Sequence, residues 1–191
     1  MTQKNAGKIC RIATAVLFLL AFFLSGNAAA SGENYWNRAV RNIAETWNSG
    51  TYDLYVPVHT WHNRLFYDRE HIDKYNEEPW GIGFGKSRYD EDGGWHGLYA
   101  MGFKDSNRYL QTIFGYAYQK NWTLGENKDW KIGVGFTLSV TQRHEYNYIP
   151  LPLPLPIAGL TYKRLSIQAA YVPGVKNDGN ILFTWLRWQL N

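Results

Sequence analysis

Histidine, serine and carboxylate side chains carry the chemistry that this sequence offers, because its only cysteine, Cys10, falls in the first thirty residues. Those residues read as a removable leader, so thiol catalysis and cysteine-based metal sites are excluded. Among the five histidines, His59 and His62 are the closest in sequence. Three positions apart on a strand, they point to opposite faces and are not expected to form a metal-binding pair. We therefore expect no metal and no organic cofactor.

A histidine and an Asp-Ser pair are the candidates for a reactive site. His62 lies near the end of the first strand-like segment, and Asp105 and Ser106 follow the third. A histidine base, an aspartate that orients it and a serine hydroxyl are together the groups that acyl transfer needs. On the residues alone an alternative stays open, in which Asp-Ser forms an ordinary turn and His62 is a solvated residue.

Eight strand-like segments must position these side chains. They span residues 54–66, 80–89, 95–103, 110–122, 130–141, 148–162, 165–172 and 181–190. Their lengths of 8 to 15 residues are close to what a tilted strand needs to cross a bilayer. No segment between them has the pattern of a long helix, which disfavours alternating helices and strands.

Aromatic residues gather near the ends of these segments, and 29 of them follow residue 30. Such clusters suit the two interfacial belts of a membrane β-barrel, although a soluble β-sandwich is the alternative. In the last segment Leu182, Leu186 and Trp188 share one face, while Arg187 and Gln189 lie on the other. The predicted fold is therefore all-β, an eight-stranded antiparallel transmembrane β-barrel with an N-terminal amphipathic α-helix.

The first thirty residues have the pattern of a secretory signal peptide. Lys4, Lys8 and Arg11 precede an apolar run over residues 12–24, and small residues follow up to Ala30, where we expect cleavage. The other 161 residues carry 17 basic and 16 acidic side chains, so nucleic-acid binding is not expected. The predicted organisation is a signal peptide over 1–30 and a barrel domain over 31–191, with the helix in 31–50 and the barrel in 52–190.

Trp36, Val40, Ile43 and Trp47 recur at helical spacing before the first strand. Such a helix could lie at a membrane surface or plug one end of a soluble barrel. An exported N-terminus starts on the periplasmic side, which places the connections after the first, third, fifth and seventh strands outside. His62, Asp105 and Ser106 would then share the outer rim.

Prolines mark two pairs of neighbouring strands. Pro57 lies in the first strand and Pro79 heads the second. Residues 150–156 include four prolines of the sixth strand, and Pro173 ends the seventh strand. Because proline cannot donate to a ladder, both seams should contain unpaired stretches that could open sideways. Glycines on inner faces, such as Gly81, Gly83 and Gly85, either leave a cavity or permit barrel closure.

Several long motifs in order resemble the PagP family of outer-membrane lipid A palmitoyltransferases, over nearly the whole chain after the leader. The motifs are Tyr52-Asp53-Leu54-Tyr55-Val56-Pro57 with Thr60-Trp61-His62, Tyr75-Asn76-Glu77 with Pro79-Trp80-Gly81, Trp95-His96-Gly97-Leu98-Tyr99-Ala100-Met101 with Phe103-Lys104-Asp105-Ser106, Asn147-Tyr148-Ile149-Pro150-Leu151-Pro152, and Pro173-Gly174 before Asn180.

The resemblance implies transfer of palmitate, or a similar long acyl chain, from the sn-1 position of a phospholipid to the hydroxymyristate chain of lipid A. It implies an outer-membrane location in a Gram-negative bacterium. It also implies catalytic positions at His62, Asp105 and Ser106, with His62 as the proton acceptor and the role of Ser106 open. By the same resemblance, Pro57 and Pro79 flank a lipid A gate.

The remaining implied positions include three departures from the family pattern. Pro156 and Pro173 would flank a phospholipid gate, and Lys176 stands where its loop often has an aromatic. Ala117 falls at the floor of the acyl-chain ruler, where glycine is expected, so the predicted ruler is shorter. His71 stands where the first outer loop would offer a lysine for lipopolysaccharide recognition. A lipid A deacylase barrel and a non-catalytic structural or adhesive barrel are the alternative functions, and both monomer and homodimer stay open.

Overall fold

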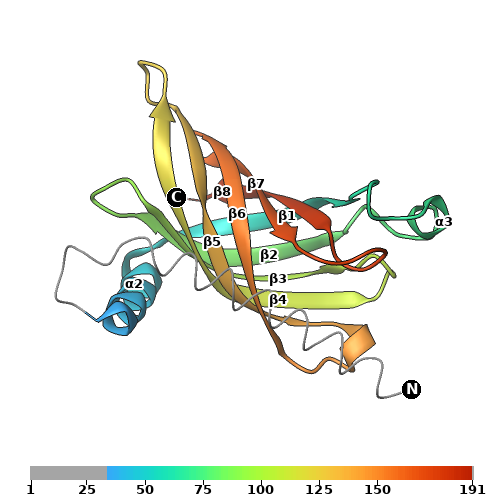
Figure 1. Cartoon of the computed structure of the whole chain (residues 1–191). Helices are drawn as coiled ribbons and strands as arrows, with labels where there is room; N and C mark the ends of the chain where they lie inside the picture. The colour runs from blue at the N-terminus through green and yellow to red at the C-terminus, as the bar shows by residue number, and fades with distance from the viewer. Residues whose placement is uncertain (1–33, 191) are drawn as a thin grey trace.

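The computed structural model describes residues 34–190, which form a closed barrel of eight strands, each antiparallel to its neighbours (Figure 1). The strands are β1 (Thr51–His62), β2 (Gly81–Tyr89), β3 (Trp95–Lys104), β4 (Leu110–Leu124), β5 (Trp130–Gln142), β6 (Leu151–Tyr162), β7 (Leu165–Val172) and β8 (Ile181–Gln189). β8 pairs with β1 and closes the ring. The predicted antiparallel barrel is confirmed, and the sandwich alternative is wrong. The predicted signal peptide lies outside the described residues.

Helix α2 (Tyr35–Ser49) precedes the barrel, as the helical spacing predicted. It attaches to the barrel through polar groups: Arg88 of β2 contacts Glu45 at 2.6 Å and donates to the Asn42 side chain at 3.0 Å. Its apolar residues face outward, and the side chains of Trp36 and Trp47 are 73% and 67% exposed. This exposure disfavours a plug and suits a helix at a membrane surface. No helix within residues 34–190 is long and apolar enough to span a membrane.

The outer surface of the barrel is apolar between two aromatic belts. Exposed apolar residues of the middle band include Val56, Ile82, Phe84, Phe114, Ile132, Val134, Leu138, Leu160 and Ile167. Exposed aromatics near one end include Tyr52, Trp122, Trp130, Tyr162 and Trp188, and those near the other include Trp61, Trp80, Tyr109 and Tyr148. This arrangement is the surface that a lipid-facing barrel requires.

The interior changes character along the barrel axis. Toward the α2 end it is polar, and the buried guanidinium of Arg187 donates to Asp53, Ser87 and Ser166 at 3.1, 3.0 and 2.8 Å. Toward the opposite end the buried side chains include the polar Thr60, Ser139 and Thr141, but most of them are apolar. They include Met101, Phe103, Ile113, Leu155, Ile157 and Ala170, with Leu153, Val172 and Phe183 packed against them. A polar floor therefore lies beneath an apolar lumen.

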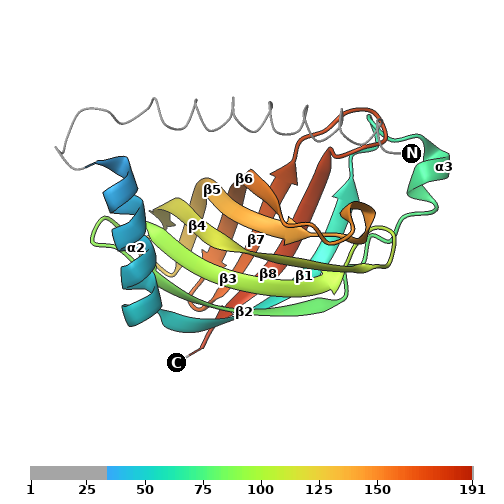
Figure 2. The same ribbon diagram turned by 90° about the horizontal axis from the view of Figure 1, so that it is seen from below.

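Long connections lie at the end of the barrel opposite α2. Figures 1 and 2 both show α2 at one end and the short helix α3 (Arg69–Ile72) of the β1–β2 connection at the other. Residues 63–80, 105–109, 143–150 and 173–180 make the four connections at the α3 end. Residues 90–94, 125–129 and 163–164 make the three at the α2 end, none of them longer than five residues. The connections after the first, third, fifth and seventh strands thus share one end of the barrel.

The inward-facing glycines do not leave a cavity at their own positions. A Cβ added to Gly81 would clash with the carbonyl oxygen of Gly102, and one added to Gly83 would clash with the side chain of Met101. Neighbouring strands approach these glycines too closely for any larger residue. The structure therefore favours their role in strand approach and barrel closure.

Candidate active site at the rim

His62 is the last residue of β1 and its side chain is fully buried. Its Nε2 atom lies 3.0 Å from the hydroxyl oxygen of Ser106, in the connection after β3. The imidazole stacks on Tyr75 at 4.8 Å between ring centroids and meets the edge of Tyr67 at 5.1 Å. The structure thus brings together the histidine and serine that the sequence placed on one rim, in a hydrogen-bonded pair.

The turn that follows β3 holds Ser106 in place. The Oδ1 atom of Asp105 accepts from the backbone N–H groups of Asn107 and Tyr109, both at 2.9 Å. The backbone N–H of Asn76 donates to the carbonyl oxygen of Ser106 at 2.8 Å. Asp105 therefore shapes the turn that presents the serine hydroxyl, as Asp side chains commonly do in turns.

A different carboxylate contacts the histidine. Glu77, in the β1–β2 connection, lies 3.0 Å from Nδ1 of His62 and accepts from the backbone N–H of the same residue at 3.1 Å. Asp105 makes no such contact, and its Oδ2 atom is buried without a hydrogen-bond partner. The structure therefore does not bring Asp105 into contact with His62, and a catalytic role for Asp105 stays a prediction. The sequence singles out Glu77 only as the last residue of the motif Tyr75-Asn76-Glu77, without a role in the site.

Arg64 completes this arrangement. Its two terminal nitrogens donate to the two oxygens of Glu77 at 2.6 and 2.7 Å, and it also donates to the carbonyl oxygen of His62 at 2.8 Å. The hydrogen bond from Arg64 is the main cause that lowers the pKa of Glu77 to about 2. Glu77 is therefore an ionised acceptor at neutral pH, so Nδ1 of His62 carries a proton and Nε2 is left to accept from Ser106.

Both predicted seams are unpaired next to the rim. Pairing of β1 with β2 ends at Tyr55 opposite Gly83, although β1 continues to His62. Pairing of β6 with β7 ends at Ile157 opposite Ala170, although β6 begins at Leu151. Pro57 lies in the unpaired part of β1 and Pro156 in that of β6. Pro79 lies two residues before β2, and Pro173 directly follows β7.

The other predicted positions are spread along the lumen and rim. Ala117 is buried in the apolar cluster, opposite Gly97 of β3 and Thr137 of β5. Lys176, in the β7–β8 connection, is exposed and lies 3.2 Å from a carboxylate oxygen of Asp68 in the β1–β2 connection. His71 is an exposed residue of α3.

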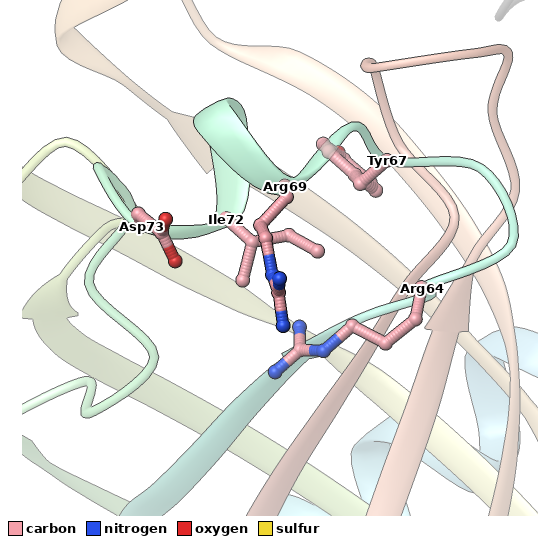
Figure 3. A pocket seen from close by; sticks show the side chains of 5 residues that line it. All are labelled: Arg64, Tyr67, Arg69, Ile72 and Asp73. Atoms are coloured by element: carbon pink, nitrogen blue, oxygen red, sulfur yellow. The ribbon is translucent and has the colours of Figure 1, made fainter.

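A pocket of about 430 Å³ lies within the β1–β2 connection, beside the Glu77 contacts. Figure 3 shows its lining side chains, with the guanidinium groups of Arg64 and Arg69 directed into the same space. Tyr67, Ile72 and Asp73 complete the lining. Because Arg64 also binds Glu77, the pocket borders the contacts that hold His62.

Together, a barrel with an apolar exterior, an apolar lumen and a histidine-serine pair at the rim defines a class of protein, a membrane barrel equipped for chemistry on lipids. Residues 42–187 match the family described as "Antimicrobial peptide resistance and lipid A acylation protein PagP". The chain belongs to this family, as the sequence motifs predicted.

Curated relatives carry the same family name. "Lipid A acyltransferase PagP" of Proteus mirabilis is 57% identical over 158 residues, which cover 82% of this chain and 74% of that protein. The protein of the same name in Musicola paradisiaca is 53% identical over 176 residues, covering 88% of this chain and 92% of that protein. Among solved structures, the outer membrane protein Ail of Yersinia pestis aligns at a TM-score of 0.40 and 9% identity, over 74% of this chain and 100% of that chain.

Proposed function

We propose that this chain is an outer-membrane acyltransferase that moves a palmitoyl or similar long chain from the sn-1 position of a phospholipid to the hydroxymyristate chain of lipid A. The observation that carries the proposal is the 3.0 Å contact between His62 and Ser106 directly above an apolar lumen. Relatives at 53–57% identity that bear the name lipid A acyltransferase support it.

The proposed reaction exchanges one ester for another. The acyl ester bond of the phospholipid breaks, an ester to the hydroxyl group of lipid A forms, and the hydroxyl proton passes to the departing lysophospholipid. His62 is placed to accept and return that proton through Nε2, with a neutral ring as the starting state. Ser106 either attacks the donor ester itself or supports the reacting hydroxyl, and trapping of an acyl-serine intermediate decides between these two routes.

The two seams would serve as the entrances for the lipids. We assign the β1–β2 seam with Pro57 and Pro79 to lipid A, and the β6–β7 seam with Pro156 and Pro173 to the phospholipid. Lipids can reach an interior site sideways only where neighbouring strands lack ladder hydrogen bonds, and these are the two stretches where the ladder ends early. Lys176 lies in the loop above the second entrance.

The outer loops offer positive charge to the phosphate groups of the lipids. Arg69 lines the pocket of Figure 3. His71 lies on α3, and its carbonyl oxygen accepts from the backbone N–H of Lys74 at 3.2 Å. Guanidinium groups bind phosphate oxygens through directed hydrogen bonds. We assign His71 to lipopolysaccharide recognition on this basis, in an outer membrane reached through the predicted signal peptide.

Purified protein in detergent, given a phospholipid labelled in its sn-1 chain together with lipid A, tests the proposal. We expect labelled lipid A of increased mass from the unaltered chain, and a loss of at least about 10²-fold in rate for His62→Ala and Ser106→Ala. His59→Ala is the matched control, because His59 is an exposed residue of the same strand. Labelled free fatty acid would indicate a deacylase, and full activity in both rim variants would refute the site.

A further inference from the structure

Glu77 contacts His62 in a way that fixes the whole imidazole. One carboxylate oxygen lies at 3.0 Å from Nδ1 and at 3.1 Å from the backbone nitrogen of the same residue. The connection itself is tied to β1 at this point, since the backbone N–H of Thr60 donates to the carbonyl oxygen of Glu77 at 2.9 Å. Moving the carboxylate away from Nδ1 would therefore also break its hydrogen bond with the backbone N–H of His62.

Arg64 restrains the same carboxylate from its other side. Its bidentate contacts of 2.6 and 2.7 Å set the plane of the Glu77 carboxylate group. Such fork-to-fork pairs are directional as well as strong. The side chain of Glu77 is 19% exposed, against 44% for Arg64, so the pair is partly shielded from water where it meets the histidine.

The other groups near the ring are committed elsewhere. The hydroxyl of Tyr67 donates to the carbonyl oxygen of Gly179 at 2.6 Å, and Tyr75 meets the ring by stacking. Asp105 uses Oδ1 for its own turn, and its Oδ2 atom lies 3.9 Å from a terminal nitrogen of Arg143. Among the described residues, Glu77 is the acceptor positioned to hold a proton on Nδ1.

We propose that Glu77, anchored by Arg64, is the positioning residue that sets the tautomer and orientation of His62 for the acyl transfer. The inference rests on the proposed function and assigns the orienting carboxylate of the site to the β1–β2 loop. Glu77 acts through His62 and touches no reacting atom. An orienting carboxylate of this kind keeps the reactive nitrogen of a histidine base unprotonated and aimed at the hydroxyl.

The test compares Glu77→Ala with Glu78→Ala, a matched control whose side chain is exposed on the neighbouring residue. In the labelled-phospholipid assay we expect Glu77→Ala to lose about 10²-fold or more in kcat, with KM within about threefold of the unaltered chain. Glu77→Gln keeps an acceptor oxygen and lacks the charge, so we expect it to lose about tenfold in kcat and to rescue most of the deficit.

Nitrogen-15 NMR of the His62 ring gives a readout that a merely structural role would not change. We expect a protonated Nδ1 and an unprotonated Nε2 in the unaltered chain and in Glu78→Ala, and a mixture of tautomers in Glu77→Ala. A kcat within twofold of the unaltered chain together with an unchanged tautomer in Glu77→Ala would overturn the inference.

Two further results separate failure of this inference from other failures. If Glu77→Ala does not fold, the isosteric Glu77→Gln decides, and a kcat within twofold of the unaltered chain overturns the inference. If the unaltered chain does not acylate lipid A, or His62→Ala remains active, then the proposed function itself fails. Activity that depends on His62 but not on Glu77 refutes only the positioning role.

Discussion

Ala117 is the residue through which the proposed selection of chain length can be tested most directly. Its methyl group is buried where the apolar lumen meets the polar floor, and Gln119, two residues further along β4, already accepts a hydrogen bond from Gln168 at 2.8 Å. We predict that an acyl chain entering from the rim stops at Ala117. Exchanging this side chain changes the depth of the lumen without touching His62 or Ser106.

The expected magnitude follows from the strand geometry. Ala117 lies opposite Gly97, and β3 runs from there to Lys104 at the rim. Seven residues at about 3.3 Å each, on a strand tilted by about 40°, correspond to roughly 18 Å along the barrel axis. At about 1.25 Å per carbon of an extended chain, which follows from bond geometry, this depth takes a chain of about 14 to 16 carbons.

Ala117→Gly deepens the lumen by about one carbon–carbon bond, or about 1.5 Å, so we expect the preferred chain to lengthen by about one carbon. Ala117→Met adds three heavy atoms beyond Cβ and should shorten the preferred chain by about three carbons, at a cost of about 1–3 kcal/mol in stability for crowding the lumen. The unaltered chain should accordingly have a shorter ruler than a relative with glycine at this position.

The assay offers the purified protein a series of phospholipids that differ only in the length of the sn-1 chain, and measures the added mass on lipid A. Ala100→Gly and Ala100→Met are the controls, because Ala100 is exposed on the outer face of β3. Identical length profiles for the unaltered chain and both Ala117 variants would refute the ruler. Addition of palmitate alone by the unaltered chain would refute its predicted shortening.

Three further expectations concern charged groups of known surroundings. The pKa of Glu77 lies near 2, below its ordinary value of 4.5, so its contribution to stability is present above about pH 4.5 and is lost as the pH falls toward 2. Carbon-13 NMR titration of its carboxyl group measures this pKa. A titration midpoint above 4 would contradict the Arg64 contact. Asp53→Asn removes the charge partner of buried Arg187 and should lower the free energy of unfolding in urea by about 3–5 kcal/mol. Asp129→Asn, at a partly exposed ion pair with Lys163, should lower it by less than about 1 kcal/mol. Lys176→Gln should change stability by less than about 1 kcal/mol yet speed hydrogen exchange in residues 176–178, and unchanged exchange would show that its contact does not hold the loop.

The strand pattern could be predicted closely because alternation is a local property of the chain. β7 spans the predicted residues 165–172, and β8 ends one residue earlier than expected. β1 begins at Thr51, three residues before the predicted start. The charged residue Asp53 made this start look like a loop, but Asp53 is buried inside the barrel, where it accepts from Arg187 near the other end of the chain. A charge neutralised by a partner 134 residues away leaves no local signal.

The rim was harder to predict, because its geometry depends on loops that fold back on the barrel. Residues 148–150 were assigned to a strand, but Asn147 and Tyr148 adopt positive φ angles of 51° and 58° after a short 3₁₀ turn, which delays β6 to Leu151. The role of Glu77 was missed for the same reason. Its contact with His62 spans 15 residues, and nothing in its spacing separates it from Glu78.

The alternation of leucine and proline on β6 has a physical reason in the seam it borders. β6 stays paired with β5 over Leu151–Pro156, while the same residues have no partner on β7. Since proline has no N–H group, the donors to β5 must come from the leucines, and the prolines occupy the positions whose N–H would face the seam.

An unpaired N–H in contact with lipid costs several kcal/mol, so a seam lined by ordinary residues would tend to close by completing its ladder. Prolines at alternate positions remove both the cost of the open state and the donors that would close it. The carbonyl groups that remain are less costly to leave without partners. Pro57 gives β1 one such position in its own unpaired stretch, where Val56 and Val58 are exposed on the outer surface. The prolines thus favour two unpaired stretches in the barrel wall, which unpaired N–H groups in lipid would otherwise close by completing the ladder.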